Sequence, residues 1–276
     1  MMSRKPEYTL DIKSTRSLKT NDFLAAVRLH CQLLPEYMPN KWGWLEPRTP
    51  FDPQQLQQLV FENGNVDDVW WRRSDKPKAT GSWIKRYYLK NERNELLLTN
   101  ATHSSIRIHV KDTQFQEKLL HYLKIASVEN EADIGIIESI AEAYESLAIL
   151  NDYAPYGGTL TLTTHTLRNW LPDMPWAVVF GSPYVRMFGK EKLLTTPAYH
   201  VEEIGAEMVL IQLTPRMEDI HEKYDEVMQA RALAKQHLGE ACFFKPELAY
   251  DYKSTKVSAE KTGKVFKVPE FVLIPD

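Results

Sequence analysis

The sequence predicts an α+β protein, in which a mixed or antiparallel sheet carries amphipathic helices packed on one face. Three observations support this class. The chain of 276 residues is 43% hydrophobic, which is enough to bury one large core. It contains segments of alternating polarity and segments of helical periodicity. The two kinds do not alternate strictly, which argues against a doubly wound parallel sheet.

The first predicted elements are a strand and a short helix. Residues 8–12 alternate apolar with polar side chains, which predicts a strand buried on one face only. A helix is predicted from the capping sequence at 20–22 as far as Pro35, because apolar residues then recur at helical spacing. Frequent prolines and glycines interrupt both patterns over residues 36–90. We expect aromatic packing rather than regular structure to order that segment.

The middle of the chain is expected to form a hairpin and two helices. Aliphatic runs at 96–98 and 106–110 predict a hairpin around residues 100–104. Apolar residues at helical spacing predict one helix from Phe115 and another from Ile136.

The last predicted elements are three strands and a long helix. Residues 176–180 form a short apolar run typical of a buried strand. The segments 199–204 and 208–213 predict a hairpin whose turn contains Gly205. Apolar residues over 220–238 mark a long helix that ends before a glycine.

The chain is expected to form one domain over residues 1–246, followed by a polar, lysine-rich arm over residues 247–276. Both parts of the domain contain strand pairs and amphipathic helices. Two interlocked and related halves, at about 1–128 and 129–246, are therefore an alternative organisation.

Charge and cysteine content exclude some classes of function. The net charge of −3 creates no field that would select DNA or an anionic membrane. Cys31 and Cys242 form neither a disulfide framework nor a metal-binding spacing. No apolar leader and no long apolar run is present, so we expect a cytoplasmic protein without a membrane segment.

No sequence motif predicts catalysis. The eight histidines are scattered without a zinc-binding pair, and neither Gly-x-Ser-x-Gly nor a glycine-rich phosphate loop occurs. We therefore expect no catalytic residue, no metal and no cofactor. A hydrolase or transferase with a site assembled from distant residues such as His109, Asp133 and His165 is the alternative.

A segment rich in tryptophan is the strongest compositional signal. Five of the seven tryptophans lie between Lys41 and Tyr88, with basic residues interleaved. They can pack the segment onto a sheet, bind a partner protein, or stack nucleic-acid bases beside held phosphates. If this segment binds a partner protein, the candidate anchors are Trp42, Trp44 and Trp71.

The densest acidic grouping begins at Glu129. Within it, Glu138, Glu142 and Glu145 are spaced to share one face of the helix predicted from Ile136. This grouping is either an electrostatic binding surface or a solvated helix face.

Two stretches together resemble a known family. They are Lys41–Pro47 with Pro50–Pro53, and Leu171–Val185 with its continuation to Tyr199. Both resemble the bacterial immunity protein 52 family, whose members are encoded beside polymorphic and type VI secreted toxins. The resemblance runs from the Trp-Gly-Trp region to the helix that ends near Leu238.

The resemblance implies an α+β fold, no catalysis, and stoichiometric binding to a cognate toxin that often carries a nuclease domain. The toxin is then the expected partner. The protein itself is expected to contact neither nucleic acid nor a membrane directly. A nuclease holds phosphates in a cationic cleft, which carboxylates on an inhibitor can block. The expected partner-binding residues are Trp42, Trp44, Trp71, Glu138, Glu142 and Glu145. A nucleic-acid-binding module built on residues 41–88 is a further alternative.

Overall fold

The computed structural model describes residues 7–16, 18, 20–44, 46–59, 68–85, 89–90, 96–97, 104–140, 170–245 and 266–271. The strands of its main sheet are β1 (Tyr8–Ser14), β2 (Lys41–Gly43), β3 (Thr49–Pro50), β4 (Asp68–Arg73), β5 (Ala79–Ile84), β8 (Ser104–Val110), β9 (Ile134–Ser139), β10 (Ala177–Phe180), β11 (His200–Ile204) and β12 (Met208–Gln212). The helices are α1 (Thr20–Leu33), α2 (Gln116–Glu129), α5 (Ser182–Phe188), α6 (Lys190–Leu194), α7 (Asp219–Glu222) and α8 (Tyr224–Leu238), with short 3-10 turns at Pro35–Tyr37, Pro53–Leu59 and Glu240–Cys242.

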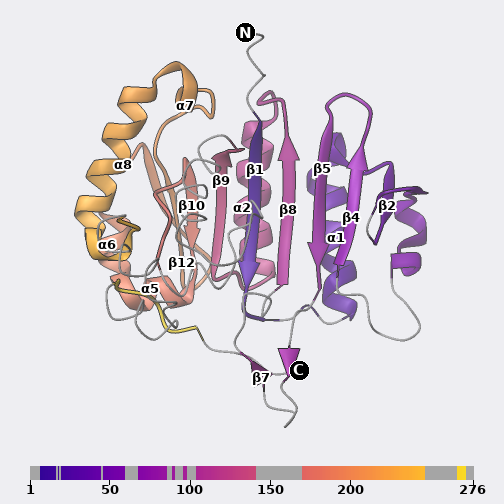
Figure 1. The fold of residues 1–276 in the computed structure, drawn as a ribbon, viewed down its shortest axis with the longest axis horizontal. Coiled ribbons are helices and arrows are strands. Elements are labelled where there is room, and N and C mark those ends of the chain that lie inside the picture. Colours follow the sequence, from indigo (N-terminus) through magenta and orange to yellow (C-terminus); the bar gives the residue numbers. More distant parts are fainter. Residues whose placement is uncertain are drawn as a thin grey trace, which may run out of the picture.

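A ten-stranded sheet forms the centre of the fold, in the order β11-β12-β10-β9-β1-β8-β5-β4-β2-β3 (Figure 1). Every neighbouring pair in this order is antiparallel. The predicted α+β class, with an antiparallel sheet, is therefore confirmed. No helix among the described residues is long and apolar enough to cross a membrane.

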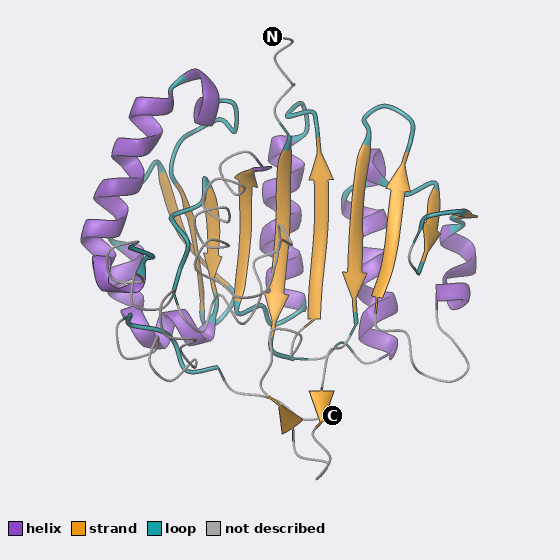
Figure 2. Ribbon diagram, in the orientation of Figure 1, coloured by secondary structure: helices purple, strands orange, loops and turns teal. Residues whose placement is uncertain are grey.

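Helices cover both faces of this sheet, whereas the sequence predicted helices on one face. On β9, Ile137 belongs to a core cluster that includes Leu123 of α2, whereas Ile136 belongs to a second cluster with Phe188 of α5 and Leu238 of α8. Successive strand residues point to opposite faces, so the two clusters lie on opposite sides. Figure 2 shows the strands in one layer with α1 and α2 behind it.

The first strand is confirmed, but it is buried on both faces rather than on one. β1 lies between β8 and β9 in the middle of the sheet. Its apolar residues, such as Leu10, face the α2 side, and its polar residues Asp11 and Lys13 are only 4% and 2% exposed on the other side. Alternating polarity predicts a solvated face only when nothing covers the polar side chains.

The hairpin predicted from residues 96–110 is wrong. β8 pairs with β1 and β5, both distant in the chain. The first aliphatic run instead forms β7 (Leu96–Leu97), which pairs with β6 (Leu89–Lys90) in a separate two-stranded sheet.

The tryptophan-rich segment contains regular strands, which corrects the expectation of an irregular segment. β2, β4 and β5 lie within residues 36–90 and pair side by side. They are short and separated by turns, and in β4 the exposed Trp70 next to the buried Trp71 breaks the alternation of polarity. These properties conceal the strand period in the sequence.

The helix predicted from Ile136 is also wrong at its start, because Ile134–Ser139 is strand β9. This strand is buried on both faces, so its residues do not alternate in polarity. Residues 141–169 lie outside the described part of the chain, and with them the rest of that predicted helix.

The remaining predicted elements are confirmed. They are the helices near residues 20–34 and 115–129, the strand β10, the hairpin β11–β12 and the long helix before Gly239. The long helix is divided at Lys223, whose φ of −131° separates α7 from α8.

The proposed division of the domain stays a prediction. β9 pairs with β1 on one side and β10 on the other, so one sheet spans both proposed halves. Within the predicted arm, only residues 266–271 are described. There Phe266 is buried against Trp170, with ring centroids 5.4 Å apart.

Candidate partner-binding surface

Most tryptophans of the 41–88 segment pack into the core. Trp71 and Trp83 are 1% and 0% exposed, and their rings lie 5.6 Å apart. His30 of α1 packs edge-on against both rings, at 5.0 and 5.5 Å. Trp42 is 7% exposed and meets the partly buried Trp44 edge-on at 5.3 Å. Of the candidate anchors, Trp42 and Trp71 therefore serve core packing.

Glu138 is a core residue rather than part of an acidic helix face. Its carboxylate accepts a hydrogen bond from the backbone N–H of Trp176 at 3.1 Å and pairs with Arg231 of α8 at 2.7 Å. The prediction that Glu138 shares an exposed helical face with Glu142 and Glu145 is therefore wrong. The last two residues lie outside the described part of the chain.

A network of buried charges lies on the same face of the sheet as Glu138. It was not predicted from the sequence. Asp11 lies 3.2 Å from Lys13 and 3.4 Å from Arg107. Ser105 joins it by donating a hydrogen bond to Asp11. Burial lowers the pKa of Lys13 to about 8, against the attraction of Asp11. Burial would raise the pKa of Asp11, but Lys13 and Arg107 outweigh it and hold that pKa below its usual value.

His109 and Asp133, the two described residues of the alternative enzyme site, are not brought together. His109 lies opposite Thr9 at one end of β1. Asp133 lies beyond the other end, where its N–H bonds the carbonyl of Lys13. From Thr9 to Lys13 a strand rises about 13 Å. His165 lies outside the described residues. Within the described ranges, no group of three or more His, Cys, Asp or Glu side chains is placed to hold a metal ion.

Part of the sheet face opposite α1 is exposed at β2, β4 and β5. Trp70 is 37% exposed, and Lys41, Arg72 and Thr80 are exposed beside it. The strand register places Arg72 between Lys41 and Thr80. The indole N–H of Trp70 donates a hydrogen bond to Asp68 at 3.0 Å. We call Lys41, Trp70, Arg72 and Thr80 the basic sheet face.

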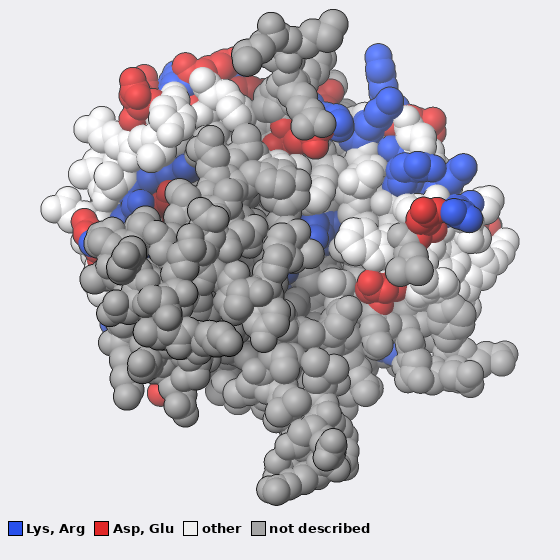
Figure 3. Space-filling model, viewed as in Figure 1, with Lys and Arg blue, Asp and Glu red and all other residues white. Residues whose placement is uncertain are grey.

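A cleft of about 310 Å³ continues the basic sheet face toward the β4–β5 turn. Its lining contains four cationic side chains and one carboxylate, and that carboxylate, Glu7, pairs with Lys111 at 2.5 Å. Among the described residues, Arg72 and Lys78 form no ion pair. Figure 3 shows Lys and Arg side chains gathered at the upper right, over β4 and β5. The surface is therefore locally cationic on a chain whose net charge is −3.

Trp70 was not among the expected partner-binding residues, because the tryptophan-rich segment was expected to be irregular. The signal was present: in a strand, two adjacent tryptophans point to opposite faces. One of the pair Trp70 and Trp71 had to face away from the core.

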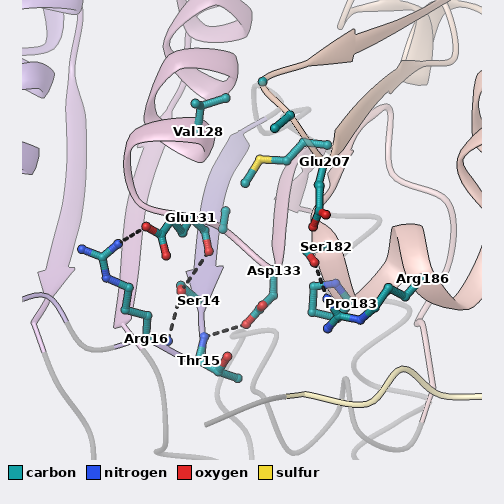
Figure 4. Close-up of a pocket in the computed structure, with 14 residues that line it drawn as sticks. Ser14, Thr15, Arg16, Val128, Glu131, Asp133, Ser182, Pro183, Arg186 and Glu207 are labelled. Carbon is teal, nitrogen blue, oxygen red and sulfur yellow. Dashed lines mark hydrogen bonds and ion pairs between the residues drawn. The ribbon is translucent and has the colours of Figure 1, made fainter. Parts of the chain in front are cut away.

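A pocket of about 460 Å³ opens at the opposite end of the sheet (Figure 4). Four segments line it: the end of β1, the α2–β9 turn, the start of α5 and the β11–β12 turn. Gly205 in the last turn has φ +59°, a conformation that side chains rarely adopt. We call this the Asp133 pocket. It is lined by Ser14, Thr15, Arg16, Val128, Glu131, Ala132, Asp133, Ser182, Pro183, Arg186, Gly205, Ala206, Glu207 and Met208.

Asp133 lies at the base of this pocket and is 8% exposed. Its carboxylate accepts a hydrogen bond of 2.6 Å from the backbone N–H of Thr15. Burial raises the pKa of Asp133 to about 6, although the Thr15 hydrogen bond and the charge of Arg186 oppose this. The group can therefore gain or lose its charge close to neutral pH.

The two guanidinium groups of the pocket have partners of their own. Arg16 pairs with Glu131 at 2.5 Å and with Asp22 at 2.9 Å. Arg186 donates a hydrogen bond to Ser182. Figure 4 shows Arg16 turned toward Glu131 and Arg186 toward Ser182.

The fold and these surfaces define an α+β protein built on one broad antiparallel sheet, with a basic face and a separate pocket that contains a buried carboxylate. A solved structure with this fold is the Pseudomonas aeruginosa T6SS protein PA0821. The match covers 92% of this chain and 86% of that one, with a TM-score of 0.50 and 12% sequence identity. A likeness at this identity shows the fold. No protein-family model matches the chain, and no curated protein does.

Proposed function

We propose that this protein is an immunity protein that binds a cognate secreted bacterial toxin stoichiometrically and neutralises it without chemistry. The observation that carries the proposal is the basic sheet face. There Trp70 is exposed, and Arg72 forms no ion pair with any described residue. Tryptophan and arginine are the residues that most often carry the binding energy of protein interfaces.

Two likenesses support a toxin as the partner. The sequence resembles the immunity protein 52 family, and the fold is like that of a T6SS protein. Both fit a toxin delivered by type VI secretion or a related system, and the resemblance adds that such a toxin often carries a nuclease domain. We place the binding in the cytoplasm, where the free thiols of Cys31 and Cys242 stay reduced.

The same face fits nucleic acid less well. Binding of single strands uses several aromatic side chains, on which successive bases stack. Trp42, Trp71 and Trp83 are buried, and Trp70 is hydrogen-bonded to the carboxylate of Asp68. A carboxylate at this position repels phosphate.

Co-expression with the product of a toxin-like reading frame adjacent to the gene tests the proposal. We expect a complex of one toxin to one protein on size exclusion, and survival of cells that the toxin alone kills. Trp70→Ala should weaken the complex about tenfold or more. The matched control is Tyr199→Ala, because Tyr199 is 61% exposed away from this face.

The proposal is overturned if the two proteins neither associate nor restore growth. Tight binding of single-stranded DNA or RNA by the protein alone, lost in Trp70→Ala, would instead favour the nucleic-acid-binding alternative.

A further inference from the structure

The Asp133 pocket lies at the opposite end of the sheet from the cationic cleft, and the basic sheet face does not use it. We propose that this pocket receives a lysine or arginine side chain of the toxin, with the cationic head at Asp133 and the aliphatic stem along the apolar wall. The inference rests on the proposed function and names the chemistry of one contact within it.

The wall of the pocket suits a long side chain with a charged end. Apolar groups of Val128, Ala132, Pro183 and Met208 line it, together with Ala206. Lysine and arginine bury their methylene stems against such surfaces while the charged head reaches polar groups. A volume of about 460 Å³ leaves room for one such side chain and accompanying water.

The buried carboxylate of Asp133 forms no ion pair with either of the two arginines that line the pocket. Arg16 is held between Glu131 and Asp22. Arg186 is exposed and bonded to Ser182 rather than to Asp133. Among the described residues, no Lys, Arg or His nitrogen pairs with Asp133 within 4 Å.

A buried carboxylate without a counter-ion lowers the stability of the folded state. Hydrogen bonds from the backbone N–H and the side chain of Thr15 offset only part of the burial of Asp133. An incoming ammonium or guanidinium group would supply the missing charge and further hydrogen bonds. Residues that lower stability in this way are concentrated at binding and catalytic sites.

Further carboxylates favour a cation at the mouth of the pocket. Glu207, on the β11–β12 turn, is exposed at the rim, and the side chain of Glu131 is 61% exposed. Asp133 also acts on the buried Tyr184 of α5, whose pKa is raised well above its usual value by burial and then by the charge of Asp133. Tyr184 therefore stays neutral and does not compete for the cation.

The toxin expected from the proposed function can supply such a side chain. A nuclease binds phosphates with lysine and arginine, so its substrate cleft presents cationic side chains. Charge complementarity of this kind steers association and selects the partner.

The first experiment measures toxin binding to variants of the full chain by surface plasmon resonance. Asp133→Asn keeps the size of the side chain and an oxygen that can accept from Thr15, and it should weaken binding about tenfold or more. Ala206→Phe, at an exposed position of the lining, should block entry to the same extent. Glu117→Gln is the control, because Glu117 is an exposed carboxylate at the far end of α2.

The second experiment uses small probes and no toxin. Nα-acetyl-lysine methylamide and Nα-acetyl-arginine methylamide are titrated into the protein, with Nα-acetyl-norleucine methylamide as the uncharged probe. Changes in the amide NMR spectrum around Gly205 and Ala206 report binding. We expect weak, saturable binding of the two cationic probes only, and its loss in Asp133→Asn.

The outcomes separate the two proposals. If the wild-type protein does not bind the toxin, the proposed function fails, whereas the probe titration still decides whether the pocket takes a cation. If the toxin binds but Asp133→Asn and Ala206→Phe bind it as the wild type does, the inference is overturned and the proposed function stands. The inference is also overturned if probe binding depends on Asp133 while toxin binding is unchanged in the variants, because the cation that the pocket takes is then a free molecule.

Discussion

The carboxylate of Glu138 in β9 and the guanidinium of Arg231 in α8 form an ion pair 2.7 Å long in the protein interior. Their side chains are 9% and 3% exposed. The pair joins the middle of the sheet to the helix that covers one end of it, and the same carboxylate also caps the N–H of Trp176 at the start of β10.

Removing one member of this pair should be costly. We predict that Glu138→Gln or Arg231→Met lowers the free energy of unfolding by about 3 to 5 kcal/mol, because either change removes the buried ion pair and leaves the other charge in the interior. The double variant should lose less than the sum of the two single losses. Urea denaturation of the four proteins measures this cycle.

An exposed ion pair provides the control for that cycle. Lys190 and Glu203 are 37% and 41% exposed, and Lys190→Met should cost less than about 1 kcal/mol. Similar losses for the exposed pair and the buried pair would contradict the importance given to burial.

The adjacent tryptophans of β4 should respond differently to truncation. Trp71→Ala removes a core ring that packs on Trp83 and His30, so it should lower the free energy of unfolding by about 3 to 5 kcal/mol. Trp70→Ala removes a side chain that is 37% exposed and should cost about 1 kcal/mol or less. Thermal melts compare the two variants, and equal losses would show that Trp70 is also a packing residue.

Asp133 should make the folded protein less stable as pH rises, which is the reverse of the effect of an ion-paired carboxylate. Its pKa is about 6 in the folded protein, against the 3.8 of an ordinary aspartate, so the folded state binds more protons between these pH values. The contribution of Asp133 to folding is therefore lost as pH rises from about 4 to 6. The shift of about two pKa units corresponds to about 3 kcal/mol.

Asp133→Asn should accordingly raise the free energy of unfolding at pH 7.5, by up to about 3 kcal/mol, and leave it nearly unchanged at pH 4. Urea denaturation of variant and wild type at several pH values measures the difference, in which the titration of other groups cancels. A difference that does not vary with pH would contradict the buried, charged state of this carboxylate.

Phe180 should be a core residue of the second cluster. It is 1% exposed in β10, and its ring lies 5.3 Å from that of Tyr184 and 5.5 Å from that of Phe188. Phe180→Ala should cost about 3 to 5 kcal/mol, and Phe180→Leu clearly less, because the leucine leaves a smaller cavity. A melting temperature that is nearly unchanged in Phe180→Ala would show that the segment is not core.

Local periodicity of polar and apolar residues was enough to predict the helices and strands whose own sequence shows a regular spacing and a cap or turn. The helix at 20–33 and the hairpin at 200–212 combine regular spacing with capping or turn residues. β9 lacked such a signal: it is short and buried on both faces, and Ile136 and Ile140 imitate helical spacing. Which elements cover a strand depends on the whole fold, so the burial of Asp11 could not be read from β1 alone.

The candidate sites were less predictable than the fold. The basic sheet face depends on which of two adjacent tryptophans points outward, and the answer required β4 to be recognised as a strand. The Asp133 pocket gathers side chains from four segments that are far apart in the chain. The sequence drew attention to Asp133 for a different reason, as a member of a catalytic group with His109, and the sheet holds those two residues at opposite ends of β1.

The central position of β1 determines when this protein can fold during its synthesis. Tyr8 pairs with Val110 on one side and with Ser139 on the other, so β1 gains its first neighbour only after residue 110 has been synthesised and its second only after residue 139. Pairing between such distant segments folds slowly and leaves apolar strand edges open in the meantime. We therefore expect both edges of β1 in the nascent chain to stay open for aggregation or chaperone binding until β8 and β9 have been synthesised.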